Sequence, residues 1–377
     1  MEKRFYLLDM FRGIGALAVL FWHWPNFLRS GDGYLPDHSI DELPFYSATS
    51  FLYNQGWLGV HLFFALSGMV FYLVYSDRVT SGAERAYPFF VKRFSRIYPL
   101  AILTTLYFFL IQNTCMSIDP DYFKFQGNDT KNFLVSIFLL QAWGIGDLYS
   151  FNVNEWSISV EMFLYIVFFC VCRYSRLMTV LLLVLFSSFI MFHDHIGQFS
   201  FVNFRIVIGT IGFFAAGAGY YCYLKIKVST SVRQWTWLLG LINLLLWVGI
   251  FIAYRRFEVN FYTYAVSVFV FPLMILWLSL IDLRNKYLVN TAKFFGDMSY
   301  PFYLIHYPLQ VTFVAVTTYL GFSREIYFSP WMFMLFMVIL LGLCMLSFHC
   351  FEKPLQRWLR AKLIRQPTLL IPENRIA

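Results

Sequence analysis

Long apolar runs alternate with short polar segments along almost the whole chain. A helix needs about 20 mostly apolar residues to cross the hydrocarbon core of a bilayer. Ten runs are of this kind, at 10–28, 56–76, 97–113, 155–173, 177–193, 204–224, 235–254, 261–281, 298–320 and 330–351. The pattern therefore predicts an all-α, polytopic membrane protein with about ten transmembrane helices and no internal repeat.

Two apolar segments need a separate interpretation. The segment 132–146 is shorter than a span, so it is predicted to be an interfacial or re-entrant helix. The first run follows Lys3 and Arg4, as the apolar part of a signal peptide would. Arg12 interrupts it, however, and no small-residue cleavage site follows, so we interpret it as the first span.

The composition agrees with lipid as the solvent. Hydrophobic residues make up 59% of the 377 residues and charged residues 13%, against about 25% charged residues in a soluble domain. The net charge of +8 could indicate nucleic acid, but the basic residues form short clusters between apolar runs, which favours a membrane protein. The six cysteines form no zinc-like spacing and are read as small hydrophobic residues, so no metal site is predicted.

The distribution of basic residues predicts the orientation. If the N-terminus is cytoplasmic, most of the 29 Lys and Arg residues fall in cytoplasmic segments, and the large outer loops are acidic. We therefore expect a multi-pass protein of the plasma membrane, most simply the bacterial inner membrane, with both termini in the cytoplasm. Residues 1–355 are predicted to form the membrane domain, and 356–377 a basic cytoplasmic tail.

Arg12 and His23 are the first charged or titratable side chains that lie within a predicted span. Eleven residues make about three helical turns, so both side chains project from nearly the same face, roughly 16 Å apart along the axis. Separately, Arg12 could be a positive-inside anchor and His23 a hydrogen-bonded core histidine. Their shared face favours a functional pair, because polar residues in spans are costly.

Other polar side chains fall at similar depths. They are His61, Ser67, Glu161, Arg205 and His306. A lone carboxylate in lipid is expensive, so Glu161 is expected either to face water or to have a partner, for which Arg205 is the natural candidate. The simpler interpretation is a structural polar network between helices.

A basic segment enters the third predicted span. Arg93 and Arg96 are three residues apart and share a helical face, so with Arg12 they could form a cytoplasmic pocket for phosphates. A lipid-headgroup anchor is the alternative. Acyl-coenzyme A combines phosphates with a long thin arm that ends in a thioester. The arm of acyl-coenzyme A could reach His23, which would act as a general base. Glu161 or His306 would orient the His23 ring or position the acceptor.

Six motifs together resemble the membrane acyltransferase-3 family over nearly the whole chain. They are the first span from Leu8 to His23, Gly59–Gly68, Arg93–Pro99, Trp156–Glu161, Ser299–Pro308 and Phe351–Pro354. Each motif alone is weak, but all six occur in the expected order.

The resemblance implies an O-acyltransferase, most simply an O-acetyltransferase, with acetyl-CoA or another acyl-CoA as donor. The acceptor would be a surface polysaccharide, such as an O-antigen or exopolysaccharide, or its lipid-linked oligosaccharide precursor. Catalytic roles are implied for Arg12 and His23, with Glu161 and His306 as further candidates, and a donor-binding role for Arg93 and Arg96. We assign substrate binding to the remaining candidates, which are His61, Ser67, Trp156 and Arg205.

Some features of the reaction remain open at this stage. A C-terminal hydrolase-like domain, which some members carry, is not expected. The lack of an evident Ser or Cys nucleophile favours direct transfer, with an acyl-His23 intermediate as the alternative. The competing functions are a transporter of an acyl group or glycolipid, for which paired repeats would be expected, and a subunit that works with polysaccharide-assembly proteins.

Overall fold

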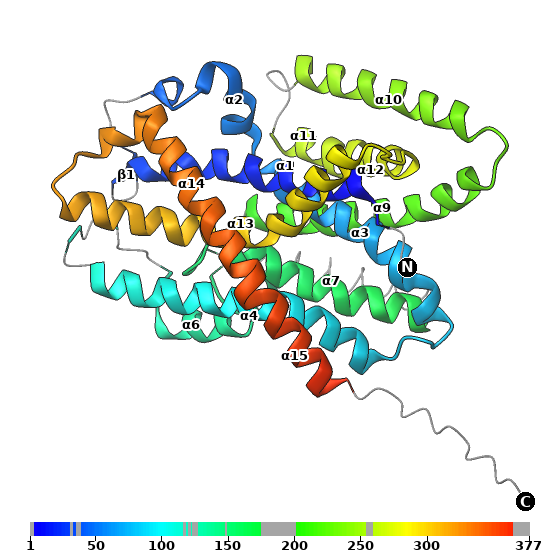
Figure 1. Cartoon of the computed structure of the whole chain (residues 1–377), viewed down its shortest axis with the longest axis horizontal. Coiled ribbons are helices and arrows are strands. Elements are labelled where there is room, and N and C mark those ends of the chain that lie inside the picture. The colour runs from blue at the N-terminus through cyan, green and yellow to red at the C-terminus, as the bar shows by residue number, and fades with distance from the viewer. Residues whose placement is uncertain are drawn as a thin grey trace, which may run out of the picture.

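The computed structural model describes residues 4–30, 33–34, 39–115, 118–119, 122, 127–147, 149–174, 201–253 and 259–364. The protein is almost entirely helical (Figure 1). The longer helices are α1 (Tyr6–His23), α3 (Leu58–Thr80), α4 (Ala86–Cys115), α7 (Glu155–Tyr174), α9 (Phe201–Lys227), α10 (Val232–Ala253), α12 (Phe271–Leu280), α13 (Lys286–Tyr319), α14 (Pro330–Leu346) and α15 (Lys353–Leu363).

Short elements connect or extend these helices. They are η1 (Trp24–Leu28), β1 (Arg29–Ser30), β2 (Gly33–Tyr34), η2 (Ile40–Glu42), α2 (Tyr46–Gln55), α6 (Thr130–Ile137), η3 (Gln141–Trp143), α11 (Val259–Ala265), η4 (Val266–Val270), η5 (Arg324–Phe328) and η6 (Ser347–Glu352). The two strands pair antiparallel, with Arg29 opposite Tyr34. The segment predicted to be interfacial or re-entrant forms only α6 and η3, which are too short to span.

Seven helical segments within the described part of the chain are long and apolar enough to cross a membrane. They are α3, α4, α7, α9, α10, the α11–α12 segment and the α14–α15 segment, and each overlaps a predicted span. The protein is therefore a multi-pass membrane protein. The runs 10–28 and 298–320 fall mainly in α1 and α13, which carry polar residues, and 177–193 lies outside the described residues. The count of ten spans and the cytoplasmic termini stay predictions.

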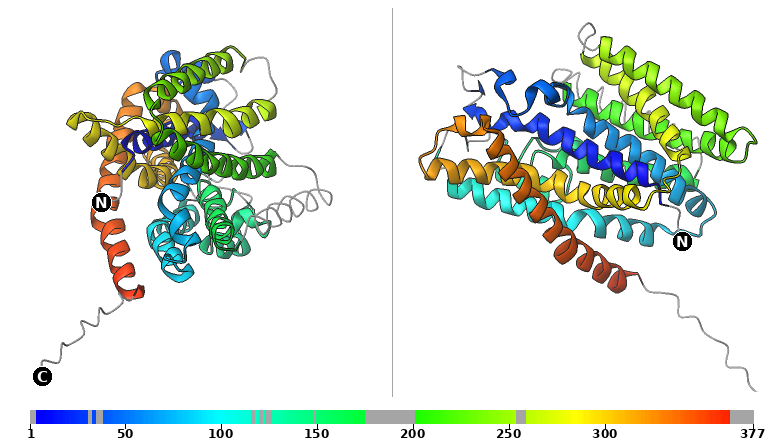
Figure 2. Two further views of the ribbon diagram at one scale, coloured as in Figure 1. Left: turned by 90° about the vertical axis from the view of Figure 1, so that its right-hand side faces the viewer. Right: turned by 45° about the horizontal axis from the view of Figure 1, so that its top comes forward.

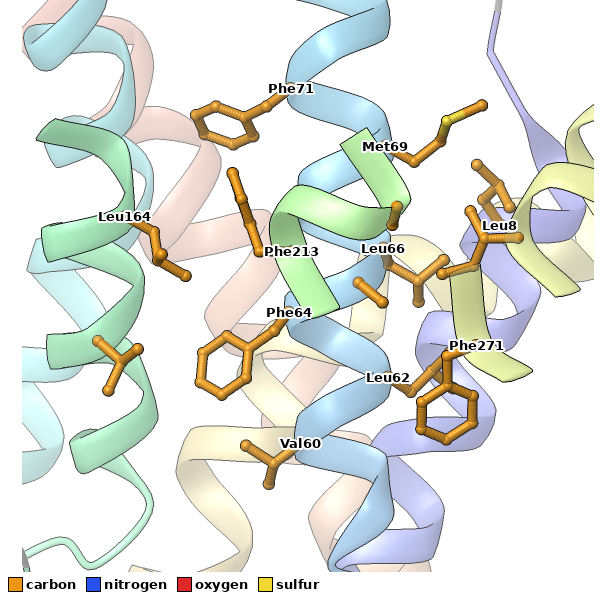
Figure 3. Packing of buried hydrophobic residues seen from close by; sticks show 14 of the residues in the cluster. Leu8, Val60, Leu62, Phe64, Leu66, Met69, Phe71, Leu164, Phe213 and Phe271 are labelled. Carbon is orange, nitrogen blue, oxygen red and sulfur yellow. The ribbon is translucent and has the colours of Figure 1, made fainter. Parts of the chain in front are cut away.

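Helix α3 lies at the centre of the larger hydrophobic core. Its side chains pack against α1, α7, α9 and α12, as the labelled residues Leu8, Leu164, Phe213 and Phe271 show (Figure 3). Helix α10 lies at the edge of the molecule, whereas α14 and α15 run obliquely over α13 and α4 (Figures 1 and 2). Little of α10 is buried, as expected for a helix that faces lipid.

Glycines let α3 approach its neighbours closely. A Cβ atom at Gly59 would collide with the carbonyl oxygen of Gly15 in α1, and one at Gly68 with that of Phe213 in α9. Small residues at such contacts are the usual way for membrane helices to pack backbone to backbone. The position of α3 is therefore tightly fixed on two sides.

Replacement of Gly68 with leucine is expected to destabilise the protein by about 1–3 kcal/mol, because the larger side chain overpacks the α3–α9 contact. A thermal melt of the detergent-solubilised protein, followed by size-exclusion chromatography, would show a lower midpoint. G249L is the matched control, since a Cβ atom at Gly249 meets nothing within 4 Å. Equal midpoints for the G68L variant and the wild type would contradict this packing.

Candidate functional site

One cavity collects arginines from three separate segments of the chain. It has a volume of about 530 Å³, and we call it the arginine cavity. Its charged lining residues are Arg4, Arg12, Arg93, Arg96, Arg360, Asp9, Glu161 and Asp297. Cations outnumber carboxylates in this lining, so the cavity favours an anionic ligand.

Most of these arginines are held by neighbouring groups. Arg4 forms ion pairs with Asp9 and with Asp297, the latter at 2.9 Å, and Arg12 lies 3.3 Å from Asp9. Burial lowers the pKa of Arg4, but the two carboxylates raise it by more, so its pKa lies above the usual value. The Arg4 guanidinium therefore stays charged.

Two further arginines reach the same cavity from α4 and α15. The Arg93 guanidinium lies over the rings of Phe71 and Tyr75, at 4.8 and 4.6 Å from their centroids. Arg360 donates to Oγ of Ser95 at 3.2 Å and to the carbonyl oxygen of Lys92 at 2.9 Å. These contacts position the two cations beside the start of α4.

Glu161 belongs to the arginine cavity. Its Oε1 accepts hydrogen bonds from Ser67 Oγ at 2.9 Å and from the Tyr165 hydroxyl at 2.6 Å. Glu161 and Ser67 thus lie together, on the side of the cations. The predicted partner Arg205 lies in α9, but its side chain is outside the described residues, so that pair stays a prediction.

A second cavity contains His23, and we call it the histidine cavity. It has a volume of about 460 Å³. Its polar and aromatic lining residues are His23, His61, Asn26, Arg29, Asp147, Asn154, Trp22, Trp57, Trp156, Tyr149, Tyr303 and Tyr307. Aromatic faces with a few polar groups are typical of a site that binds a small organic molecule.

His23 and His306 form a hydrogen-bonded pair. Nδ1 of His23 lies 2.9 Å from Nε2 of His306, and Nδ1 of His306 lies 3.0 Å from the carbonyl oxygen of Phe302. A carbonyl oxygen only accepts, so His306 carries its proton on Nδ1 and accepts on Nε2 when neutral. His23 then donates from Nδ1, and its lone pair is on Nε2. The pair therefore prepares His23 to accept a proton at Nε2.

Proline and asparagine residues hold His306 in place. Pro308 has no N–H to bond to the carbonyl oxygen of Leu304, and that oxygen accepts instead from Nδ2 of Asn152 at 3.1 Å. Nδ2 of Asn154 lies 3.0 Å from the carbonyl oxygen of Tyr303 and 3.3 Å from Nε2 of His306. The segment before α7 is thus tied to α13 beside the histidines.

The two cavities meet inside the bundle. Val60 of α3 and Tyr303 of α13 line both of them. The arginines and the histidine pair therefore lie on opposite sides of a shared wall.

The structure sorts the candidates into two groups. It brings Arg12, Arg93 and Arg96 together, as expected, and adds Ser67 and Glu161 to them. His23, His61 and Trp156 line the histidine cavity, and His306 bonds to His23. Glu161 lies with the cations and not with the histidines, and the side chain that contacts His23 is that of His306.

Sequence reasoning missed Arg4, Arg360 and Asn154. The sequence predicts that Arg360 lies in a basic tail. In the structure α15 continues directly from η6, and Arg360 lines the arginine cavity. The division at 355 itself stays a prediction, and 365–377 lies outside the described residues. Asn154 had a usable signal, since it lies just before the Trp156–Glu161 motif.

Within the described ranges, no group of three or more His, Cys, Asp or Glu residues could hold a metal ion.

Comparisons with known proteins bear on this geometry. A family profile described as an acyltransferase domain matches residues 5–349. A protein of Acidianus two-tailed virus with the provisional name acetyltransferase ORF330 is 25% identical over 314 residues, which is 82% of this chain and 84% of the viral protein. Protein 2 in the picA locus of Rhizobium radiobacter is 31% identical over 101 residues, or 27% of this chain and 42% of that protein. The comparison with solved structures found no match.

Proposed function

We propose that this acyltransferase, which belongs to the family whose domain matches residues 5–349, transfers an acyl group from cytoplasmic acyl-CoA to a glycan hydroxyl. The acyl group is most simply acetyl. The acceptor in this proposal is a surface polysaccharide or its lipid-linked precursor. The observation that carries the proposal is the pair of cavities that share Val60 and Tyr303. Family membership favours this enzyme over the transporter considered from the sequence.

The arginine cavity suits the phosphates of coenzyme A. Arginine forms bidentate, charge-assisted hydrogen bonds with phosphate oxygens, which makes it the preferred residue for such groups. Arg12, Arg93, Arg96 and Arg360 would hold the nucleotide end at the cytoplasmic surface. The pantetheine arm would then run along α1 towards His23, over a distance of roughly 16 Å from Arg12.

The histidine cavity suits a sugar. The rings of Trp22, Trp57 and Trp156 offer apolar faces for the C–H side of a pyranose, while Asp147 and Asn154 can bond to hydroxyls. The acceptor would enter from the outer face, where the predicted loops are acidic. Donor and acceptor would thus approach the shared wall from opposite sides of the membrane.

The proposed reaction is a direct transfer. Nε2 of His23 accepts the proton of the acceptor hydroxyl, whose oxygen attacks the thioester carbonyl carbon. The C–S bond breaks, and the coenzyme A thiolate takes the proton from His23 to leave as a thiol. His306 holds the imidazole in the required tautomer through its bond to Nδ1.

The acyl content of the surface glycan tests this proposal. Cells that lack the protein should lose O-acyl signals in the NMR spectrum of their surface polysaccharide. The wild-type protein should restore these signals, whereas an H23A variant present in the membrane at equal amount should not. Identical spectra with and without the wild-type protein would sink the proposal.

A further inference from the structure

Val60 and Tyr303 form the only stretch of lining that the arginine and histidine cavities have in common among the described residues. Under the proposed function, the acyl group must pass this wall to reach the hydroxyl beside His23. Both side chains are almost fully buried, with 7% of Val60 and 4% of Tyr303 exposed. The size of these side chains therefore decides what can pass, provided that neither can move away.

Tyr303 is held at both ends of its side chain. Its hydroxyl donates to the carbonyl oxygen of Asn154 at 3.1 Å and lies 2.7 Å from Oγ of Ser157. Its ring packs edge-on against Phe63, with centroids 5.4 Å apart. Its carbonyl oxygen accepts from Nδ2 of Asn154, which also fixes the backbone. These contacts fix the Tyr303 ring, so it does not rotate away from the boundary between the two cavities.

Val60 is equally constrained. It is one residue beyond Gly59, where the backbones of α3 and α1 touch. It is also β-branched, so its χ1 rotation is restricted within a helix. Val60 and Phe63 are three residues apart on one face of α3, and Phe63 contacts Tyr303. Helix α3 cannot shift outward here without losing the contact at Gly59.

We propose that Val60, which lines the same wall as the fixed Tyr303 ring, is the residue that sets the size of the acyl group that this protein transfers. The inference rests on the proposed function. A rigid apolar wall accepts a short acyl group and excludes one with additional methylenes, because it cannot relax around them. One methylene changes the discrimination of such a wall by about tenfold or more.

A competition between two donors tests this inference. Purified protein receives equal amounts of acetyl-CoA and butyryl-CoA with dodecyl maltoside as the hydroxyl acceptor, and mass spectrometry gives the ratio of butyryl to acetyl esters. V60A should raise this ratio by about tenfold, and V60I should lower it. Both esters come from the same protein sample, so the ratio does not depend on how much of a variant is folded.

The matched control is V79A, because Val79 is a buried valine of α3 that lines neither cavity. V79A should keep the wild-type ratio. An unchanged ratio in V60A and V60I, with ester formation by the wild type, would overturn the role of Val60 and leave the proposed function intact. Absence of any ester from the wild type with either donor would overturn both.

Discussion

Replacement of His23 with alanine is expected to lower the rate of acyl transfer by about 10²–10⁴-fold, which is the range that general-base catalysis contributes. The loss should appear in kcat, with little change in the KM for acyl-CoA, because His23 lines the histidine cavity and not the arginine cavity. Initial rates of ester formation by the purified variant measure both constants. An H23A variant with wild-type kcat would remove His23 from the mechanism.

Variants of His306 separate positioning from structure. H306L leaves the Nδ1 donor of His23 without the acceptor on His306, at a cost of about 1–3 kcal/mol, or about 5- to 150-fold in kcat. H306Q places an amide oxygen near the position of Nε2 and should restore much of the rate. Equal rates for the leucine and glutamine variants would show that this hydrogen bond does not matter.

Replacement of Arg12 with alanine is expected to raise the KM for acetyl-CoA by about 10- to 100-fold. A charge-assisted hydrogen bond to phosphate contributes about 1.5–3 kcal/mol, which corresponds to this range. The fold should tolerate the change, because Asp9 keeps its ion pair with Arg4. Steady-state kinetics with acetyl-CoA as the varied substrate would measure the effect.

A truncated donor shows whether Arg12 contacts the phosphates. S-acetylpantetheine lacks the nucleotide and its phosphates, so R12A and the wild type should use it equally well. R357A is the control, since Arg357 is exposed on α15 and does not line the arginine cavity. An R12A defect of equal size with both donors would place Arg12 elsewhere in the reaction.

The membrane character of the protein and much of the arginine site were predictable from the sequence. Lipid exposure leaves apolar runs that can be counted, and basic residues cluster at the ends of these runs. These clusters predict that Arg12, Arg93 and Arg96 lie near one another, and the structure places all three in the lining of one cavity. Within the described part of the chain, the seven helical segments that are apolar enough to span each overlap a predicted run.

The pairing of His23 with His306 was not predictable in the same way. Sequence periodicity gives the face of one helix, but the rotation of α1 against α13 depends on tertiary contacts. One such contact is at Gly296, where a Cβ atom would meet Asp9 at 2.5 Å. Only this packing decides that His306, rather than Glu161, lies beside His23. The position of Val60 between the two cavities was not predictable either, because a valine within an apolar run carries no sequence signal.

Transfer across a sealed membrane tests the central claim most directly. Proteoliposomes would enclose labelled acetyl-CoA, and maltoheptaose, which cannot cross the bilayer, would be supplied outside. We expect labelled acetyl-maltoheptaose outside with coenzyme A retained inside, and loss of this product in the R12A/H23A double variant. Equal product from the wild type and the double variant would exclude transfer through these two residues.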